Sequence, residues 1–287
     1  MTLLRLLCLL LLCSPLGLLQ ASDAPTLRAR HQALAEQLAN TPYQRPLYLE
    51  SKQSDSQLQG DIYAEIEQPF SVTGSALQGT EQWCELLILH LNVKGCQASG
   101  SAAQPAITLH VGSKFDQLLA DAYPFEFRYQ VEVTEADYLR VVLNAPQGPL
   151  GTSDYRIVLD VLALDDRRSF LHLSYAYSYG MVASLAMQGY LATGGRDKVG
   201  FSIVGKTDSG EPQYLDGMRA VVERNTMRYY LAIDAYLGAL SLPAAARLDK
   251  RLNDWHSGVE RYPRQLHELD RAAYLSMKHQ EIQRQQR

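Results

Sequence analysis

The sequence contains one match to a known chemical motif, since residues 200–207 fit the phosphate-binding pattern G-x-x-x-x-G-K-[ST]. That chemistry needs a strand before the first glycine and a helix after the Lys-Thr pair, so that backbone N–H groups and a helix N-terminus face the phosphates. Here residues 201–204 read as the strand itself, and residues 208–212 read as a turn. We therefore interpret the match as accidental.

Side chains that could carry catalysis or bind a metal do not gather at recognisable spacings. Among the 7 histidines, only His256 has a carboxylate, Glu260, at helical i,i+4 spacing. A metal site needs a third ligand, so we interpret this pair as part of a solvated helix face. There is no G-x-S-x-G nucleophile elbow either. The sequence predicts no catalytic residues, no cofactor and no metal.

A tyrosine-rich strand offers a binding surface instead. Alternation along the predicted strand 169–179 places five side chains on one face: Leu171, Leu173, Tyr175, Tyr177 and Tyr179. Tyrosine combines an apolar ring with a polar tip, which suits an amphipathic ligand. Strands also favour tyrosine for packing alone. Tyr175, Tyr177 and Tyr179 are therefore candidate ligand contacts, with simple packing as the alternative.

The strongest helix pattern, residues 215–240, supplies two further candidates. A projection at about 100° per residue gives one narrow stripe, made of Val221, Asn225, Arg228, Ala232, Ala235 and Ala239. We expect Asn225 and Arg228 to be the polar groups of a cavity beside this helix, where the alanines leave room. Arg228 would then hold a ligand carboxylate or phosphate. The alternative is internal pairing with Glu223, Asp234 or a carboxylate of the sheet.

Alternation of apolar and polar residues between positions 106 and 178 predicts an antiparallel sheet. Its consecutive strands are expected at residues 125–133, 138–144, 154–164 and 169–179. The charged residues 165–168 are expected to form a hairpin turn.

The remaining segments are mostly helical in pattern. Before the sheet we expect a helix at 25–40, a polar linker at 50–60, a strand at 61–67 and two short helices within 71–91. Later we expect a helix at 181–191, a short strand at 199–204, the helix at 215–240 and a helical region at 244–286, broken near Pro263. The basic tail, residues 278–287, reads as a solvated helix, with contact to an anionic lipid surface or a partner as the alternative.

Residues 1–21 are typical of a secretory signal peptide. Arg5 precedes the apolar residues 6–12, and Ala21 is a candidate for the last residue before cleavage. An uncleaved membrane anchor is the alternative.

Cleavage would leave two of the 4 cysteines, Cys84 and Cys96, and an even pair in an exported chain predicts a disulfide. One unbroken helix would separate their Cα atoms by about 18 Å, whereas a disulfide allows at most about 7 Å. The bridge therefore requires the chain to turn back around residues 89–92. Two unpaired buried thiols are the alternative.

Composition limits the class of protein. Hydrophobic residues make up 46% of the chain and charged residues 20%, which is typical of a globular protein. The net charge of -4 argues against nucleic-acid binding. Beyond the N-terminus no apolar run reaches 18 residues, which excludes a polytopic membrane protein.

A strand, two short helices, a long antiparallel meander and a long C-terminal helix, in this order, resemble the START-like superfamily of lipid carriers, hormone-binding proteins and polyketide cyclases. The segments that carry the resemblance are GDIYAEIEQPFSVTGSAL, QWCELL, the meander, and DGMRAVVERNTMRYYLAIDAYLGAL. The resemblance implies an α+β helix-grip fold, in which the sheet wraps around the last helix and leaves an apolar cavity. An extra helix before that last helix, and helical extensions at both ends, depart from the pattern. The expected parts are a signal peptide (1–21), an N-terminal helix and linker (22–59), a helix-grip domain (60–242) and a C-terminal helical extension (243–287).

The sequence therefore predicts an exported protein, periplasmic or extracellular, that binds an apolar or amphipathic small molecule, with a lipid as one candidate. Two other classes stay open: an enzyme such as a cyclase or hydrolase acting in the same cavity, and a structural or interaction protein with a closed core. A perturbed acid or base deep in the cavity would favour the enzyme. We expect no nucleic-acid partner, and peripheral membrane contact through the basic tail stays open.

Overall fold

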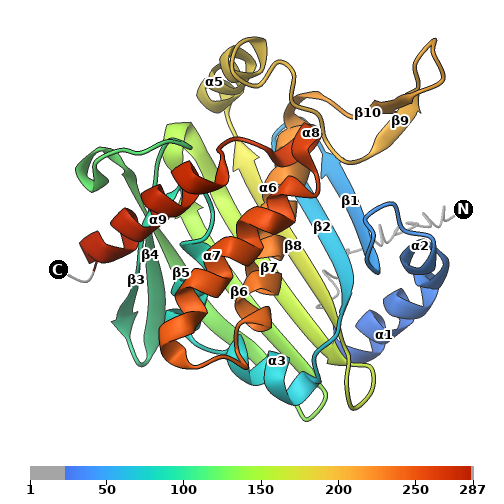
Figure 1. Cartoon of the computed structure of the whole chain (residues 1–287), viewed down its shortest axis with the longest axis vertical. Helices are drawn as coiled ribbons and strands as arrows, with labels where there is room; N and C mark the ends of the chain where they lie inside the picture. Colours follow the sequence, from blue (N-terminus) through green and yellow to red (C-terminus); the bar gives the residue numbers. More distant parts are fainter. Residues whose placement is uncertain (1–22, 286–287) are drawn as a thin grey trace, which may run out of the picture.

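The computed structural model describes residues 23–285, so the expected signal peptide lies outside the described residues. Its centre is an eight-stranded antiparallel sheet of order β1-β2-β8-β7-β6-β5-β4-β3 (Figure 1). The strands span Leu47–Gln53 (β1), Gln57–Ile66 (β2), Val93–Ser101 (β3), Gln104–Val111 (β4), Tyr123–Thr134 (β5), Tyr138–Gln147 (β6), Thr152–Ala163 (β7) and Ser169–Tyr179 (β8). The four strands predicted for the meander are confirmed as β5 to β8. The predicted turn between β7 and β8 is confirmed too, since the Leu164 N–H donates to the Arg168 carbonyl at 3.1 Å.

The long helix α6 (Gly217–Gly238) packs against β1, β2 and β8 on one face of the sheet. Gly60 of β2 permits this close approach, because a Cβ there would stand 2.3 Å from Oγ1 of Thr226. The helices α4 (Thr80–Leu87) and α7 (Ala244–Glu260) cover other sides of α6. The chain thus has the expected α+β helix-grip architecture, with the sheet held against the long helix.

Shorter elements complete the fold (Figure 1). They are α1 (Ala24–Ala33), α2 (Ala35–Ala39), α3 (Phe70–Ala76), α5 (Met181–Ala192), α8 (Pro263–Leu266), α9 (Arg271–Gln285), the 3-10 turns η1 (Leu119–Asp121) and η2 (Pro149–Gly151), and the ribbon of β9 (Ile203–Lys206) and β10 (Pro212–Tyr214). None of the helices within residues 23–285 is both long enough and apolar enough to cross a membrane.

Apolar side chains form separate cores on the two faces of the sheet. The larger core lies between the sheet and α6. The smaller core joins α1 and α2 to the opposite face, where Leu27, Leu34 and Leu38 pack near Tyr138 and Phe170. The single helix expected at residues 25–40 is thus two helices.

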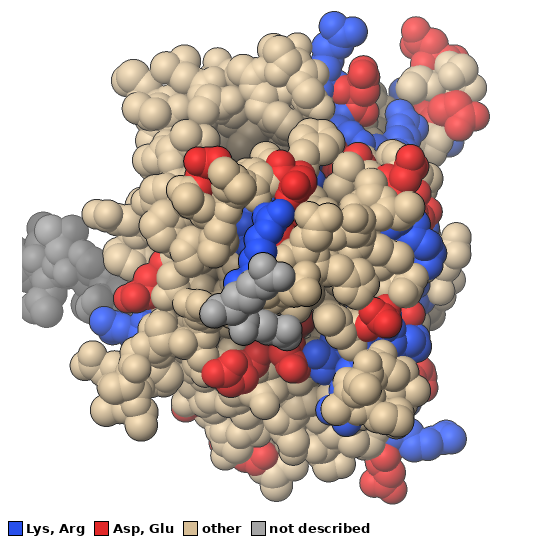
Figure 2. Space-filling model, turned by 60° about the vertical axis from the view of Figure 1, so that its left-hand side comes forward, with Lys and Arg blue, Asp and Glu red and all other residues tan. Residues whose placement is uncertain are grey.

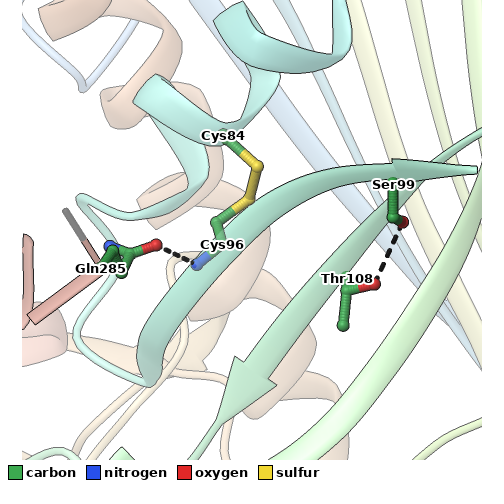
Figure 3. The surroundings of a disulfide bond; sticks show 5 residues. All are labelled: Cys84, Cys96, Ser99, Thr108 and Gln285. Carbon is green, nitrogen blue, oxygen red and sulfur yellow. Dashed lines mark hydrogen bonds between the residues drawn. A yellow bond between two sulfur atoms is a disulfide. The ribbon is translucent and has the colours of Figure 1, made fainter. Parts of the chain in front are cut away.

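The predicted disulfide is present. The Cα atoms of Cys84 on α4 and Cys96 on β3 lie 5.2 Å apart (Figure 3). The chain reverses between the end of α4 at Leu87 and the start of β3 at Val93, as the bridge requires. Gln285 of α9 approaches from the other side and accepts a hydrogen bond from the Cys96 N–H at 2.6 Å (Figure 3).

The prediction of a polar linker at residues 50–60 is wrong, because β1 and β2 form a hairpin there. The polar side chains have partners above the edge of the sheet: Ser51 donates to Glu223 at 2.6 Å, and Glu50 pairs with Arg30 at 2.8 Å. The domain boundary expected at residue 60 falls inside β2. The short strand expected at 199–204 is also shifted and occupies Ile203–Lys206.

The prediction of a solvated basic tail is wrong at Lys278, which is fully buried on α9. Its Nζ donates to the carbonyl oxygens of His90 and Val93 and to Glu281. Glu281 also pairs with the buried Lys94 at 2.9 Å. Burial lowers the pKa of Lys278 to about 8, against the opposing charge of Glu281. This network fastens α9 to the turn that leads into β3.

Candidate functional site

A cavity of about 390 Å³ lies between the N-terminal half of α6, the sheet and α5. This volume falls within the range of small-molecule sites. Its apolar lining comes from several elements and includes Leu109, Val111, Phe125, Ala183, Met187, Met218 and Val221. The interior beside α6 is therefore open at this end rather than closed.

Tyrosines form one wall of the cavity. The rings of Tyr155 and Tyr177 stack at 5.1 Å, and those of Tyr175 and Tyr229 lie 5.3 Å apart. The Tyr155 hydroxyl donates to Thr152. Those of Tyr175, Tyr177 and Tyr229 have no hydrogen-bond partner within residues 23–285. Burial raises the pKa of all three well above the ordinary value, so they are neutral donors at pH 7.

His90 and Asn225 give the cavity a polar end. His90 is 3% exposed, and its ring stacks on Tyr229 at 4.9 Å. The Asn92 N–H donates to Nδ1 of His90 at 3.1 Å, which assigns the imidazole proton to Nε2. That Nε2 is buried and has no partner in the described chain. Burial, assisted by the charge of Arg228, lowers the pKa of His90, so the ring is a neutral donor.

Cations stand directly behind this polar end. Arg228 donates to Oδ1 of Asn225 at 3.4 Å and to Glu268 at 3.0 Å. Lys114 donates to the hydroxyl of Tyr190, another cavity residue, at 3.0 Å, and to the same Glu268 oxygen at 2.5 Å. Although burial acts the other way, Lys114 lowers the pKa of Tyr190 and of Glu268. Burial lowers the pKa of Arg228 to about 10, so its guanidinium remains charged at pH 7.

The mouth of the cavity lies between η2 and α5, where the lining residues Leu150 and Ala186 are exposed. Residues 180–195, which include α5, contain no charged residue. Met181, Val182 and Leu185 of α5 are exposed, by 81%, 66% and 61%. Accordingly, the upper left of the molecule in Figure 2 shows almost no charged side chain.

The structure places the predicted site residues as follows. Tyr175, Tyr177, Tyr179 and Asn225 all line the cavity. Tyr179 lies near the rim, where its hydroxyl donates to the Ser54 carbonyl.

Arg228 is not part of the cavity lining and forms an internal ion pair, although with none of the partners that the alternative named. Its partner is Glu268, which comes from the C-terminal extension rather than from the sheet or α6. The alanines at 232, 235 and 239 leave no room beside α6, since all three are buried by packing.

Other residues of the site have no distinctive sequence signal. Tyr155 and Tyr229 could have been found as aromatic members of a strand and of the long helix. His90, Lys114 and Glu268 lie in connecting segments, and only the folded chain brings them together.

The interpretation of His256 as part of a solvated face is wrong. Its side chain is 5% exposed, and Nε2 lies 2.9 Å from the Leu269 carbonyl. Glu260 pairs instead with His267. In residues 23–285, no group of three or more His, Cys, Asp or Glu side chains is placed to hold a metal ion.

The accidental nature of the phosphate pattern is also visible in the structure. The N–H groups of Phe201 and Ser202 donate to the carboxylate of Glu223 at 2.6 and 2.9 Å. These backbone donors are therefore already used by an internal anion, and the strand that follows does not lead into a helix.

A second cluster of titratable groups lies in a polar groove on the opposite face of the sheet. His172 stands between Asp61 and Asp160, with 3.0 Å from a ring nitrogen to each carboxylate. Asp160 also accepts hydrogen bonds from Tyr138 and Arg140. Burial opposes the charged ring, but the two carboxylates raise the pKa of His172 to about 9. The charges of this cluster satisfy one another, so we interpret it as structural.

Comparison with known proteins gives matches in fold alone. No family model matches the chain, and no curated protein matches it in sequence. One similar solved structure is human StAR-related lipid transfer protein 5, with 10% identity over 59% of this chain and 91% of that chain, at a TM-score of 0.33. Another is truncated norcoclaurine synthase from Thalictrum flavum, with 11% identity over 50% of this chain and 90% of that chain, at a TM-score of 0.33. A conserved protein from Geobacillus kaustophilus is similar over 47% of this chain and 84% of that chain, at 17% identity and a TM-score of 0.32. The START-like proteins that the sequence resembles are thus among the matches. Likenesses this distant carry no argument about function, and the helix-grip assignment rests on the sheet order and the position of α6.

Proposed function

We propose that the protein is an exported binding protein that holds an apolar or amphipathic small molecule, with a lipid as one candidate, in the cavity beside α6. The observation that carries this proposal is the composition of the wall. Apolar groups line most of it, while three tyrosine hydroxyls and Nε2 of His90 have no partner in residues 23–285. Of these donors, Nε2 of His90 is a fully buried atom without a partner in the described chain, and buried polar groups are ordinarily hydrogen-bonded, so it favours a ligand that carries an acceptor.

The enzyme alternative would need a general acid or base in the cavity, and His90 is the residue to consider. A general base must offer a lone pair to its substrate. Nδ1 of His90 already accepts from the Asn92 N–H, and the free Nε2 carries the proton. The ring can donate a hydrogen bond to a ligand but cannot accept a proton from it in this tautomer. This geometry favours binding over base catalysis.

Export to the periplasm or the extracellular space is supported by two features. The bridge between Cys84 and Cys96 is of a kind that persists in oxidising compartments. The N-terminal sequence has the composition of a signal peptide.

The test is a titration of the purified protein with Nile red, a neutral dye that fluoresces in apolar surroundings. Val221→Trp should fill the cavity, because Val221 lines it from α6. Gln188→Trp is the matched control, since it adds the same ring at an exposed position of α5 outside the lining. We expect saturable binding by the wild type and by Gln188→Trp, and at least tenfold weaker binding by Val221→Trp. Equal binding by all three proteins would contradict the proposal.

A further inference from the structure

Positive charge exceeds negative charge around the polar end of the cavity. Four cations, Lys114, Lys198, Arg224 and Arg228, lie close enough to Glu268 to interact with it electrostatically, and Glu223 acts on Arg224 as well. Four positive charges thus face two carboxylates. The hydrogen-bond partners of Lys198 and Arg224 carry no net charge: Lys198 donates to the His267 carbonyl, and Arg224 donates to the Val199 carbonyl and to Tyr190.

Glu268 does not satisfy the cations that contact it. Lys114 and Arg228 share its Oε1, and Nε of the buried Arg228 has no partner in the described chain. An excess of buried like charge is costly, and a second anion would offset it.

The cavity presents donors at the same place. Nε2 of His90 is buried in the wall without a partner. The amide nitrogen of Asn225 also has no partner within residues 23–285, because only its Oδ1 is engaged, by Arg228. Lys114 and Arg228 each stand one hydrogen bond behind a cavity residue, Tyr190 and Asn225 respectively.

We propose that this polar end is an anion subsite, where His90 and Asn225 contact the anionic head group of an amphipathic ligand and Lys114 and Arg228 supply the balancing charge. The inference rests on the proposed function and names its ligand class: an apolar body with a carboxylate or phosphate at one end. The subsite depends on the segments that depart from the START-like pattern, since Tyr190 lies on α5 and Glu268 lies in the C-terminal extension.

The test compares three ligands that share a ten-carbon chain: decanoate, decyl phosphate and 1-decanol. Isothermal titration of the purified protein should show at least one of the anions binding about tenfold or more tightly than the alcohol, since a hydrogen bond to a charged group contributes about 1.5–3 kcal/mol. The tighter of the two anions identifies the head group.

Three variants assign the preference to the charges. Lys114→Met should reduce the preference for the anion, measured as the ratio of its affinity to that of 1-decanol, to less than about threefold; the ratio cancels any effect that loss of the Tyr190 contact has on both ligands. Glu268→Gln should tighten anion binding by about threefold or more, because it removes the competing carboxylate. Arg167→Met, at an exposed arginine of the β7–β8 turn, is the control and should change neither. If Lys114→Met fails to fold, Glu268→Gln decides alone. If Glu268 only held the fold together and did not compete with a bound anion, its replacement by glutamine would not tighten anion binding.

Equal binding of all three ligands by the wild type would overturn the anion subsite and leave the proposed function standing. Failure of both 1-decanol and the anions to bind would contradict the proposed function itself. Unchanged or weaker anion binding by Glu268→Gln would also overturn the subsite.

Discussion

The doubly paired His172 on the outer face of the sheet should make the stability of the protein depend on pH. Its two ring nitrogens lie 3.0 Å from Asp61 and from Asp160, and these carboxylates raise its pKa from 6.5 to about 9 against the effect of burial. Between these two values the folded protein keeps a proton that the unfolded chain has released. The free energy of unfolding therefore falls as the pH rises through this window.

The magnitude follows from the pKa. A rise from 6.5 to about 9, at about 1.4 kcal/mol per pH unit, corresponds to about 3 kcal/mol. This stabilisation is fully present below pH 6.5 and is lost as the pH passes about 9. Lys278 acts in the opposite direction, because its pKa is lowered to about 8, and stability from that group rises with pH above this value. A variant of His172 is needed to separate the two effects.

The assay is urea unfolding of the wild type and of His172→Gln, from pH 6 to pH 9.5. Glutamine retains hydrogen-bonding capacity but carries no charge. The free energy of unfolding of the wild type, minus that of the variant, should decrease by about 3 kcal/mol across this range. A difference that stays constant, or one that grows with pH, would refute the assignment of a protonated His172 in the folded state.

Three further predictions concern the fold and the cavity. Replacing Cys84 and Cys96 together by alanine should lower the free energy of unfolding by about 3 kcal/mol, and alkylation of the unfolded, unreduced wild type should label neither residue; labelling of both would contradict the bridge. Leu159→Asp should abolish folding, whereas Val158→Asp should be tolerated better, because Leu159 is fully buried in the main core while Val158 lines the outer groove. Circular dichroism of the two variants compares their loss of folded structure, and a greater loss in Val158→Asp would contradict the orientation of β7. Tyr190→Phe should accelerate release of a bound ligand without unfolding the protein, since it removes the hydrogen bond from Lys114 that fastens α5. Stopped-flow dilution of the Nile red complex measures the release rate, and an unchanged rate would show that this contact does not hold α5.

The sheet could be predicted because its signal is local. Strand β5 buries alternate side chains, so its apolar period of two is visible in the sequence. Strands β6, β7 and β8 are buried on both faces over most of their length, and their signal is a local apolar run bounded by turn residues. The β1–β2 hairpin could not be predicted in this way. Ser51 and Glu50 are polar because they have partners on distant segments, Glu223 and Arg30, and no local pattern records such pairs.

The candidate site was predictable only in part, for a similar reason. The projection of α6 selected Asn225 and the alternation of β8 selected Tyr175, and both residues line the cavity, but neither method shows which face another element covers. The partner of Arg228 is 40 positions away, on a segment that follows α8. Its identity depends on how the C-terminal extension packs, which the period of one helix does not determine.

The claim that the cavity beside α6 holds a small molecule is tested most directly by native mass spectrometry of protein purified without detergent and then incubated with decanoate or 1-decanol. The account predicts an additional mass on the wild type and on Gln188→Trp that is lost on denaturation, and no such mass on a folded Val221→Trp variant. A wild type that carries no additional mass under these conditions, or a Val221→Trp variant that carries the same one, would contradict it.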